Sequence, residues 1–235
     1  MIAHMRVLAV VPARSGSKGI PDKNMQPLGN QSLIGWAGLT LKACPNVDLA
    51  IISTDSPRYA EEGRRYGLEA PFLRPPELST DMAGAVETVR HAVNATEALY
   101  GSFFDIVLIV EPTCPLRRPE DIEGALTMLV ETGADSVVTV SQVDLKYHPH
   151  KVLKIEQDRL TFYDPAGAAV KARQTLAPLY WKNGACYALT RRCLLDDRVI
   201  FSTNTLAYVV DRMMVNIDEP HELEFARHLV ERGVL

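Results

Sequence analysis

Apolar and polar positions along this chain alternate between short β-rich runs and stretches of helical spacing. Apolar runs of strand length occupy residues 5–11, 49–53, 105–110 and 136–140. Between them, apolar residues recur every three or four positions in stretches that predict helices at residues 32–43, 57–66, 79–98 and 119–131. This alternation is typical of a Rossmann-like, doubly wound α/β fold with a mainly parallel sheet.

The alternation of strand and helix patterns stops at residues 141–180, which carry scattered charges, prolines and short apolar runs. This stretch is interpreted as an arm or insertion instead of another strand–helix unit. Strand-like runs at 185–189 and 206–210, and a final helix at 219–232, restore the pattern. We expect one domain over residues 1–235, which is long enough to bury a substantial core.

Composition narrows the class of protein. The formal net charge is −4 and the hydrophobic fraction is 47%, which argues against a nucleic-acid binder with a basic face. The four cysteines are far apart without a CxxC pair, so we expect reduced, buried thiols and neither a zinc site nor disulfides. The apolar run at 7–11 is too short to span a membrane and lacks a signal-peptide plan. A cytoplasmic protein is predicted.

The segment at residues 12–24 (PARSGSKGIPDKN) carries the strongest chemical signal. It follows the first predicted strand, at the edge where α/β sheets bind ligands. Gly16 and Gly19 allow the backbone to approach an anion closely, and Arg14, Lys18 and Lys23 supply three cations. The segment matches neither the P-loop nor the dinucleotide fingerprint. It predicts a different phosphate-binding loop.

This loop resembles the signature of the cytidylyltransferases that activate sialic acid and related nonulosonic acids. The resemblance continues in order along most of the chain, at residues 53–55 (STD), 73–81 (LRPPELSTD), 112–117 (PTCPLR), 134–138 (ADSVV), 183–185 (NGA) and 217–218 (ID). It implies a Rossmann-like domain, CTP as substrate, Mg²⁺ as cofactor and a homodimer. In this family an arm of one subunit reaches the partner's sugar site, and residues 141–180 would be that arm.

The resemblance also implies roles for individual residues. Those expected to meet the nucleotide are Arg14, Ser17, Lys18, Lys23, Asn24, Arg74 and Asp81. Lys23, Arg14 and Asp218 are expected to be catalytic, with Lys23 stabilising charge at the α-phosphate. Asp218 and Asn216 are expected to hold the metal, since Mg²⁺ takes one or two carboxylates together with phosphates. The family usually has a second aspartate where this chain has Asn216.

The sugar site is expected to contain Glu111, Lys151, Arg173 and Asn183. The family usually has glutamine where this chain has Glu111, and a carboxylate there would repel an anionic sugar unless it is paired or protonated. Three explanations are open: the sugar's substituents differ, Glu111 meets an amine or hydroxyl, or Glu111 supplies the metal charge that Asn216 lacks. Lys151 and Arg173 would approach the sugar carboxylate from the partner subunit.

The expected reaction is attack by the anomeric hydroxyl of an acidic nine-carbon sugar on the α-phosphate of CTP, which releases pyrophosphate. The residues do not identify the general base. One alternative is a cytidylyltransferase for Kdo or another acidic sugar, although the Kdo-type loop is absent. An alternative from another class is a catalytically impaired nucleotide-binding sensor, which Asn216 favours and the retained cations oppose. Neither nucleic acid nor membrane is expected as a partner.

Overall fold

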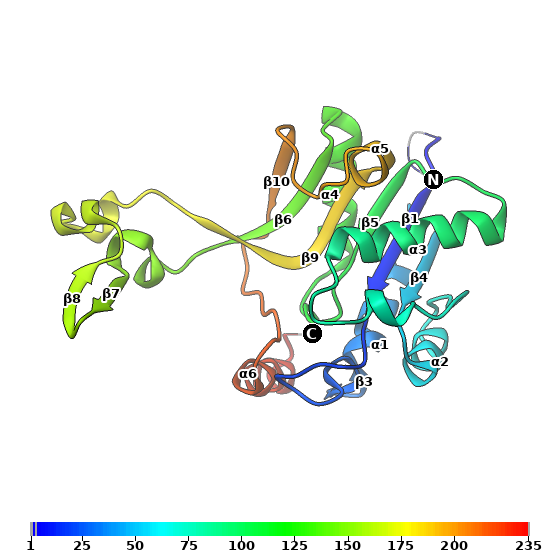
Figure 1. The fold of residues 1–235 in the computed structure, drawn as a ribbon, viewed down its shortest axis with the longest axis horizontal. Helices are drawn as coiled ribbons and strands as arrows, with labels where there is room; N and C mark the ends of the chain where they lie inside the picture. Colours follow the sequence, from blue (N-terminus) through cyan, green and yellow to red (C-terminus); the bar gives the residue numbers. More distant parts are fainter. Residues whose placement is uncertain (1, 3, 235) are drawn as a thin grey trace.

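The computed structural model describes residue 2 and residues 4–234, apart from the side chain of Arg173. Over this part of the chain, the central sheet has six strands in the order β10-β6-β9-β5-β1-β4 (Figure 1). Their bounds are Val7–Pro12 (β1), Leu49–Ser53 (β4), Ile106–Ile109 (β5), Ser136–Gln142 (β6), Tyr180–Thr190 (β9) and Thr205–Val209 (β10). β9 runs antiparallel to both of its neighbours, and the other pairings are parallel. The mainly parallel α/β prediction is therefore confirmed.

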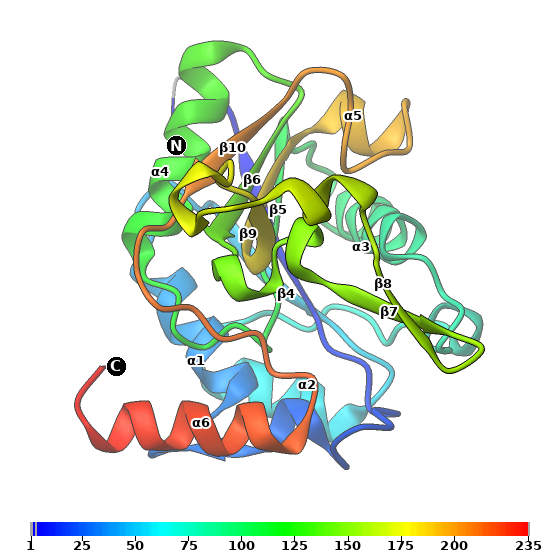
Figure 2. The same ribbon diagram turned by 90° about the vertical axis from the view of Figure 1, so that its left-hand side faces the viewer.

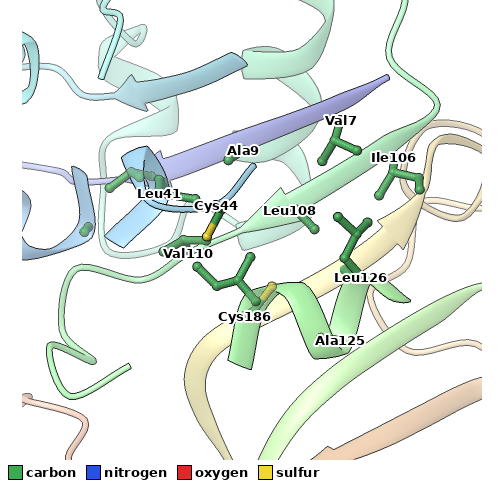
Figure 3. Packing of buried hydrophobic residues seen from close by; sticks show 14 of the residues in the cluster. Val7, Ala9, Leu41, Cys44, Ile106, Leu108, Val110, Ala125, Leu126 and Cys186 are labelled. Atoms are coloured by element: carbon green, nitrogen blue, oxygen red, sulfur yellow. The ribbon is translucent and has the colours of Figure 1, made fainter. Parts of the chain in front are cut away.

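Helices cover both faces of the sheet. The helices are Leu33–Lys42 (α1), Pro57–Arg65 (α2), Ala85–Tyr100 (α3), Pro119–Thr132 (α4), Arg191–Leu195 (α5) and Pro220–Glu231 (α6). Alternate β1 residues point to opposite sides, as pleated geometry requires. Val7 and Ala9 pack with α1 and α4 (Figure 3), whereas Leu8 and Val10 pack with α3 and α5. The doubly wound arrangement follows from strands that are apolar on both faces.

Local signals explain most helix starts. Ser32 caps α1 by accepting a hydrogen bond from the Gly35 amide, and Ser56 caps α2 in the same way. Proline occupies the first turn of α2, α4 and α6, where its missing N–H costs nothing. The predicted start of α3 was wrong: the helix begins at Ala85, not at residues 79–81. Asp81 pairs with cations of the loop at 12–24 instead of capping the helix.

The irregular stretch is a projecting arm between β6 and β9. It contains a small hairpin, Leu153–Glu156 (β7) with Arg159–Phe162 (β8), and several short 3-10 turns. Figure 1 shows the arm extending away from the sheet, and Figure 2 views the molecule from the arm's side. Ile155 and Leu160 on the hairpin are 74% and 63% exposed. The arm therefore presents apolar side chains without a covering layer from its own chain.

All four cysteines are free and buried, as predicted. Among the described residues, no helix combines the length and apolar character that crossing a membrane demands.

A second small hairpin, Pro27–Leu28 (β2) with Gln31–Ser32 (β3), links the loop at 12–24 to α1.

Candidate functional site

A cleft of about 520 Å³ opens at the carboxyl ends of β1 and β5. It is lined by residues from the loop at 12–24, the start of α3, the turn after β5 and the segment before α6. The predicted site residues that line it are Arg14, Ser17, Lys18, Lys23, Asn24, Arg74, Glu111 and Asp218. With Arg74, residues from five separate parts of the sequence therefore meet at the edge where α/β folds bind ligands.

The loop at 12–24 is held in shape by contacts at its base. Ser15 donates to both carboxylate oxygens of Asp55, from its amide at 2.9 Å and its hydroxyl at 2.7 Å. Burial raises the pKa of Asp55, but these bonds outweigh it and lower the pKa below its usual value. The buried Asn24 amide donates to the Arg14 carbonyl at 3.1 Å. The loop's cations thus project from a fixed frame.

The cations of this loop are paired with two carboxylates from elsewhere in the chain. Asp81 bridges Arg14 at 2.7 Å and Lys18 at 2.5 Å, and the bonds from Lys18 and then Arg14 lower its pKa. Lys23 Nζ lies 2.7 Å from Asp218 Oδ1. Because carboxylates occupy these positions, the cations at the cleft are already arranged to bind anionic groups.

Arg74 forms part of the cleft wall and is only 5% exposed. Its guanidinium donates to the hydroxyl and the carbonyl of Ser53. Burial lowers the pKa of Arg74 to about 10. Arg74 is therefore a buried cation with one fixed orientation, and not a member of a surface ion pair.

Glu111 lies where β5 ends, beside the turn at Gly184. Its Oε2 accepts a hydrogen bond from Asn216 Nδ2 at 3.4 Å. Gly184 has φ +76°, and a Cβ added there would lie 2.3 Å from the same oxygen. Burial, the charge of Glu111 and a hydrogen bond to it raise the pKa of Tyr187. Strand pairing explains the meeting, because Tyr187 is the partner of Ile109 on β5.

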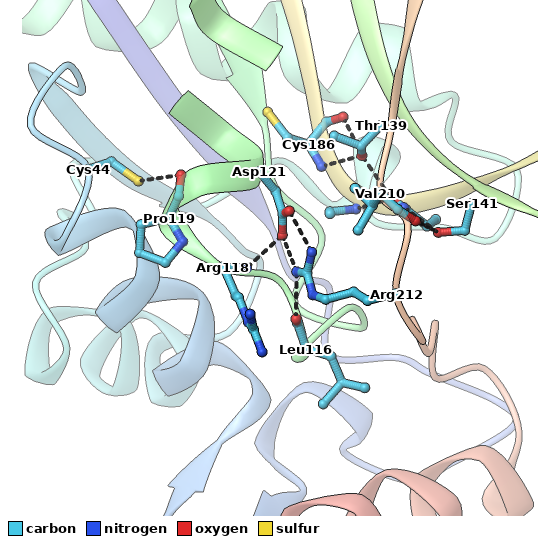
Figure 4. A network of polar contacts seen from close by, with 12 residues as sticks. Cys44, Leu116, Arg118, Pro119, Asp121, Thr139, Ser141, Cys186, Val210 and Arg212 are labelled. Carbon is cyan, nitrogen blue, oxygen red and sulfur yellow. Dashed lines mark hydrogen bonds and ion pairs between the residues drawn. The ribbon is translucent and has the colours of Figure 1, made fainter. Parts of the chain in front are cut away.

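The segment that carries Asn216 and Asp218 is anchored on both sides. Ile217, between them, is fully buried and donates its amide to the Thr113 carbonyl at 2.8 Å. Upstream, Arg212 donates to the Asp121 carboxylate and to the Leu116 carbonyl (Figure 4). Asn216 and Asp218 both line a second hollow that adjoins the cleft through Asp218. The segment therefore holds two oxygen-bearing side chains at this second hollow, and one of them, Asp218, also lines the cleft.

Two predicted sugar-site residues, Asn183 and Lys151, do not line the cleft. Asn183 is buried, and its side chain contacts Thr139, Ser141 and the Ala185 amide. Lys151 is exposed in the arm, at the end of a 3-10 turn. Arg173 also lies in the arm, and its side chain is outside the described part of the structure. Lys151 is therefore not brought to the cleft of its own chain.

Sequence reasoning missed several residues of the site. Thr88 and Glu219 line the cleft, and Tyr187 contacts Glu111. Glu219 directly follows Asp218, and Thr88 lies in the first turns of α3. No pattern in the sequence indicated Tyr187 as a site residue. Its position depends on the antiparallel register of β9, which the sequence pattern does not specify.

Comparisons with known proteins agree with this geometry. A family model described as cytidylyltransferase matches residues 8–229. The CMP-N,N'-diacetyllegionaminic acid synthase of Legionella pneumophila is 31% identical over 232 residues, which is 97% of each chain. The N-acylneuraminate cytidylyltransferase of Streptococcus agalactiae serotype V is 32% identical over 87% of this chain and 48% of its own length.

A solved structure titled as CMP:2-keto-3-deoxy-manno-octonic acid synthetase complexed with CTP superposes with a TM-score of 0.72. It covers 97% of this chain and 99% of its own, at 17% sequence identity. At this identity the likeness shows the shared fold.

Proposed function

The chain belongs to the cytidylyltransferase family, and on that premise we propose that it transfers CMP from CTP to the anomeric hydroxyl of a nonulosonic acid and releases pyrophosphate. The observation that carries this proposal is the meeting of Arg14, Lys18, Lys23 and Asp218 in one cleft. The two relatives reported above are named a CMP-N,N'-diacetyllegionaminic acid synthase and an N-acylneuraminate cytidylyltransferase, and both names refer to nonulosonic acids, which supports a nonulosonic acid as acceptor.

The cations of the cleft bind the triphosphate. Arg14 and Lys18 release Asp81 and take phosphate oxygens in its place, and Ser17 and Asn24 complete the loop's contacts with the nucleotide. Lys23 faces the α-phosphate, where it stabilises the negative charge that develops during transfer. Arg74 holds a fixed positive charge at the wall. Nucleotidyl transfer depends mainly on such positioning and charge, so no nucleophilic side chain is required.

The donor set of the cleft fits a divalent cation such as Mg²⁺. Asp218 offers a carboxylate, and the buried Oδ1 of Asn216 has no hydrogen-bond partner among the described residues. Mg²⁺ needs few protein ligands when phosphate oxygens and waters complete its shell. Such an ion would neutralise phosphate charge during transfer. Lys23 then exchanges Asp218 for phosphate.

The acceptor sugar sits beside Glu111, near the junction of β5 and β9. Lys151 and Arg173 meet its carboxylate from the arm of a second subunit, so the active form is a homodimer with residues 141–180 as its exchange arm. Asn183 acts from the interior, where its bonds to Thr139 and Ser141 fix the turn that carries Gly184. The protein works in the cytoplasm, in keeping with its four free cysteines.

Pyrophosphate release tests this function. The protein is incubated with CTP, Mg²⁺ and a panel of nine-carbon keto-acids together with Kdo. We expect release with a nonulosonic acid, and loss of release in Lys23→Ala. Lys42→Ala, on an exposed turn of α1, is the matched control and should keep full activity. CTP binding without release for any acceptor would favour the sensor alternative, and release with Kdo alone would favour the Kdo alternative.

A further inference from the structure

Glu111 and Asn216 are joined by one hydrogen bond, although 105 positions separate them in the sequence. Asn216 Nδ2 donates to Glu111 Oε2 at 3.4 Å. An ionised carboxylate can only accept hydrogen bonds, so the asparagine must turn its NH₂ group toward Glu111. The opposite orientation would place two acceptors face to face. Glu111 therefore decides which way the amide of Asn216 points.

This orientation leaves the other end of the amide without a partner. Asn216 Oδ1 is buried and accepts no hydrogen bond within the described part of the chain. A buried polar atom without a partner is costly in a native protein and usually has a functional explanation. An amide oxygen is a suitable ligand for a hard divalent cation. The unpaired atom therefore points to a bound cation.

The side chain of Glu111 has no ion-pair partner in the described part of the chain. Its described side-chain contacts are the neutral donors Asn216 and Tyr187, and no lysine, arginine or histidine whose side chain the structure describes forms an ion pair with its carboxylate. The buried Arg117 guanidinium donates to the backbone carbonyl of Glu111, and burial lowers the pKa of Arg117 against the smaller, opposite effect of the Glu111 charge. Both Glu111 and Asp218 line the cleft, and Lys23 pairs with Asp218. The Glu111 carboxylate is therefore free to act on a bound cation.

We propose that Glu111 is a positioning residue for a divalent-cation site in which Asn216 Oδ1 and Asp218 are the ligands. Glu111 turns the Asn216 oxygen toward the ion and adds the second negative charge to the site. Gly184 permits this arrangement, because any Cβ there would collide with Glu111 Oε2. The proposal rests on the proposed function for the use of the ion but not for its binding.

Experiment can distinguish this role of Glu111 from a role in binding the acceptor sugar. If Glu111 only receives a hydroxyl or ammonium group of the acceptor sugar, its removal changes the KM for the acceptor and leaves cation affinity unchanged. If Glu111 positions the cation site, cation affinity changes when no acceptor is present. The metal-binding readout is also independent of transfer, so it can succeed even if the proposed acceptor class is wrong.

The test is Mn²⁺ binding, followed through the electron paramagnetic resonance signal of free Mn²⁺, with the protein alone and with CTP added. We expect wild type to bind one Mn²⁺ at this site and Glu111→Gln to bind it about 10–100-fold more weakly, the range for loss of a partner that orients a ligand. The double variant Glu111→Gln/Asn216→Asp should recover affinity, because it restores the carboxylate at the neighbouring position.

The matched control is Glu219→Gln, which removes one negative charge from the same cleft without touching Asn216. It should change Mn²⁺ affinity less than Glu111→Gln does. Equal loss in the two variants would reduce the effect to general electrostatics and overturn the proposal. Equal Mn²⁺ affinity of wild type and Glu111→Gln with CTP present, or no recovery in the double variant, would overturn it as well.

Discussion

Lys23 Nζ lies 2.7 Å from Asp218 Oδ1, although the two residues are 195 positions apart. The approach of their segments depends on Gly19, where a Cβ would lie 2.7 Å from the Asp218 carbonyl oxygen. Each partner thus holds the other in place, and under the proposed function the lysine exchanges the carboxylate for phosphate and the carboxylate binds a cation. The pair couples the loop at 12–24 to the segment before α6.

Asp218→Asn should separate these two roles. The amide keeps an oxygen for the cation but loses the charge, so we expect the Mg²⁺ concentration for half-maximal activity to rise at least about tenfold. Saturating Mg²⁺ should recover part of the rate, because Lys23 is still present. Glu231→Gln, exposed at the end of α6, is the control. An unchanged Mg²⁺ requirement would exclude Asp218 as a metal ligand.

Asp81→Asn should strengthen CTP binding. Under the proposed function, the triphosphate competes in wild type with the Asp81 carboxylate for Arg14 and Lys18, and the amide of the variant carries no charge for that competition. We expect the Kd for CTP, measured by calorimetry, to fall severalfold. In the unliganded variant, amides of residues 12–24 should exchange hydrogen faster because the loop loses two ion pairs. Weaker CTP binding in the variant would instead make Asp81 a direct nucleotide contact.

Gly184→Ala should perturb the site more than an equivalent change elsewhere. Gly184 and Gly133 both have positive φ, +76° and +66°, but only Gly184 has neighbours that an added Cβ would meet. A left-handed backbone conformation destabilises a non-glycine residue by roughly 1–2 kcal/mol. Gly184→Ala and Gly133→Ala should therefore both show a lower free energy of unfolding in urea. The decrease should be larger for Gly184→Ala, which should also weaken Mn²⁺ binding. Equal losses would mean that Glu111 moves aside freely.

Much of this architecture could be predicted because it is encoded locally. The apolar runs at 7–11 and 49–53 predicted buried parallel strands, and the loop at 12–24 predicted cations at the edge of the sheet where the cleft opens. The start of α3 was missed because Asp81 serves a tertiary ion pair with Arg14 instead of capping the helix. A competition between local and distant partners is invisible in a pattern of residue types.

The remaining parts of the site depend on register and on long-range contacts. Asn183 matched a family position, yet only the fold shows that its amide is used inside the protein. Tyr187 reaches Glu111 because β9 runs antiparallel beside β5, and a one-residue shift would turn it to the other face. The meeting of Glu111 with Asn216 depends on another long-range contact, the bond from the Ile217 amide to the Thr113 carbonyl.

The four cysteines should be unreactive toward thiol reagents in the folded protein. Burial raises the pKa of Cys44 and Cys114 to about 12 and that of Cys193 to about 11, and it raises the pKa of Cys186 as well. Since the thiolate is the reactive form, a disulfide reagent at pH 8 should label none of the four cysteines in native protein. All four should react in denaturant. Fast labelling of a native thiol would contradict its burial.

The same pKa shifts determine how the free energy of unfolding changes at alkaline pH. A thiol in the unfolded chain has a pKa of about 8.5, whereas the folded thiols keep their protons to higher pH. Their contribution is therefore fully present below the unfolded value and is lost as pH rises toward 11–12, through the folded values. Urea midpoints measured from pH 7.5 to pH 11 should fall above the unfolded value, and Cys114→Ala should weaken that dependence. A Cys114→Ala profile parallel to that of wild type would assign the alkaline loss to other groups.

Complementation between two inactive variants should reveal where the arm acts. Lys23→Ala disables the cleft, and Arg173→Ala disables the arm. In a mixed dimer with exchanged arms, the intact cleft of the Arg173→Ala chain receives the intact arm of the Lys23→Ala chain, so one site works. Random assembly of co-expressed chains should then give roughly a quarter of wild-type activity, as for a symmetric two-fold dimer. No recovery would mean that each arm serves its own cleft.

The double variant Ile155→Glu/Leu160→Glu places charges on the exposed hairpin. It should abolish both the dimer in sedimentation and the complementation. Leu99→Glu, on the exposed side of α3, should leave both intact.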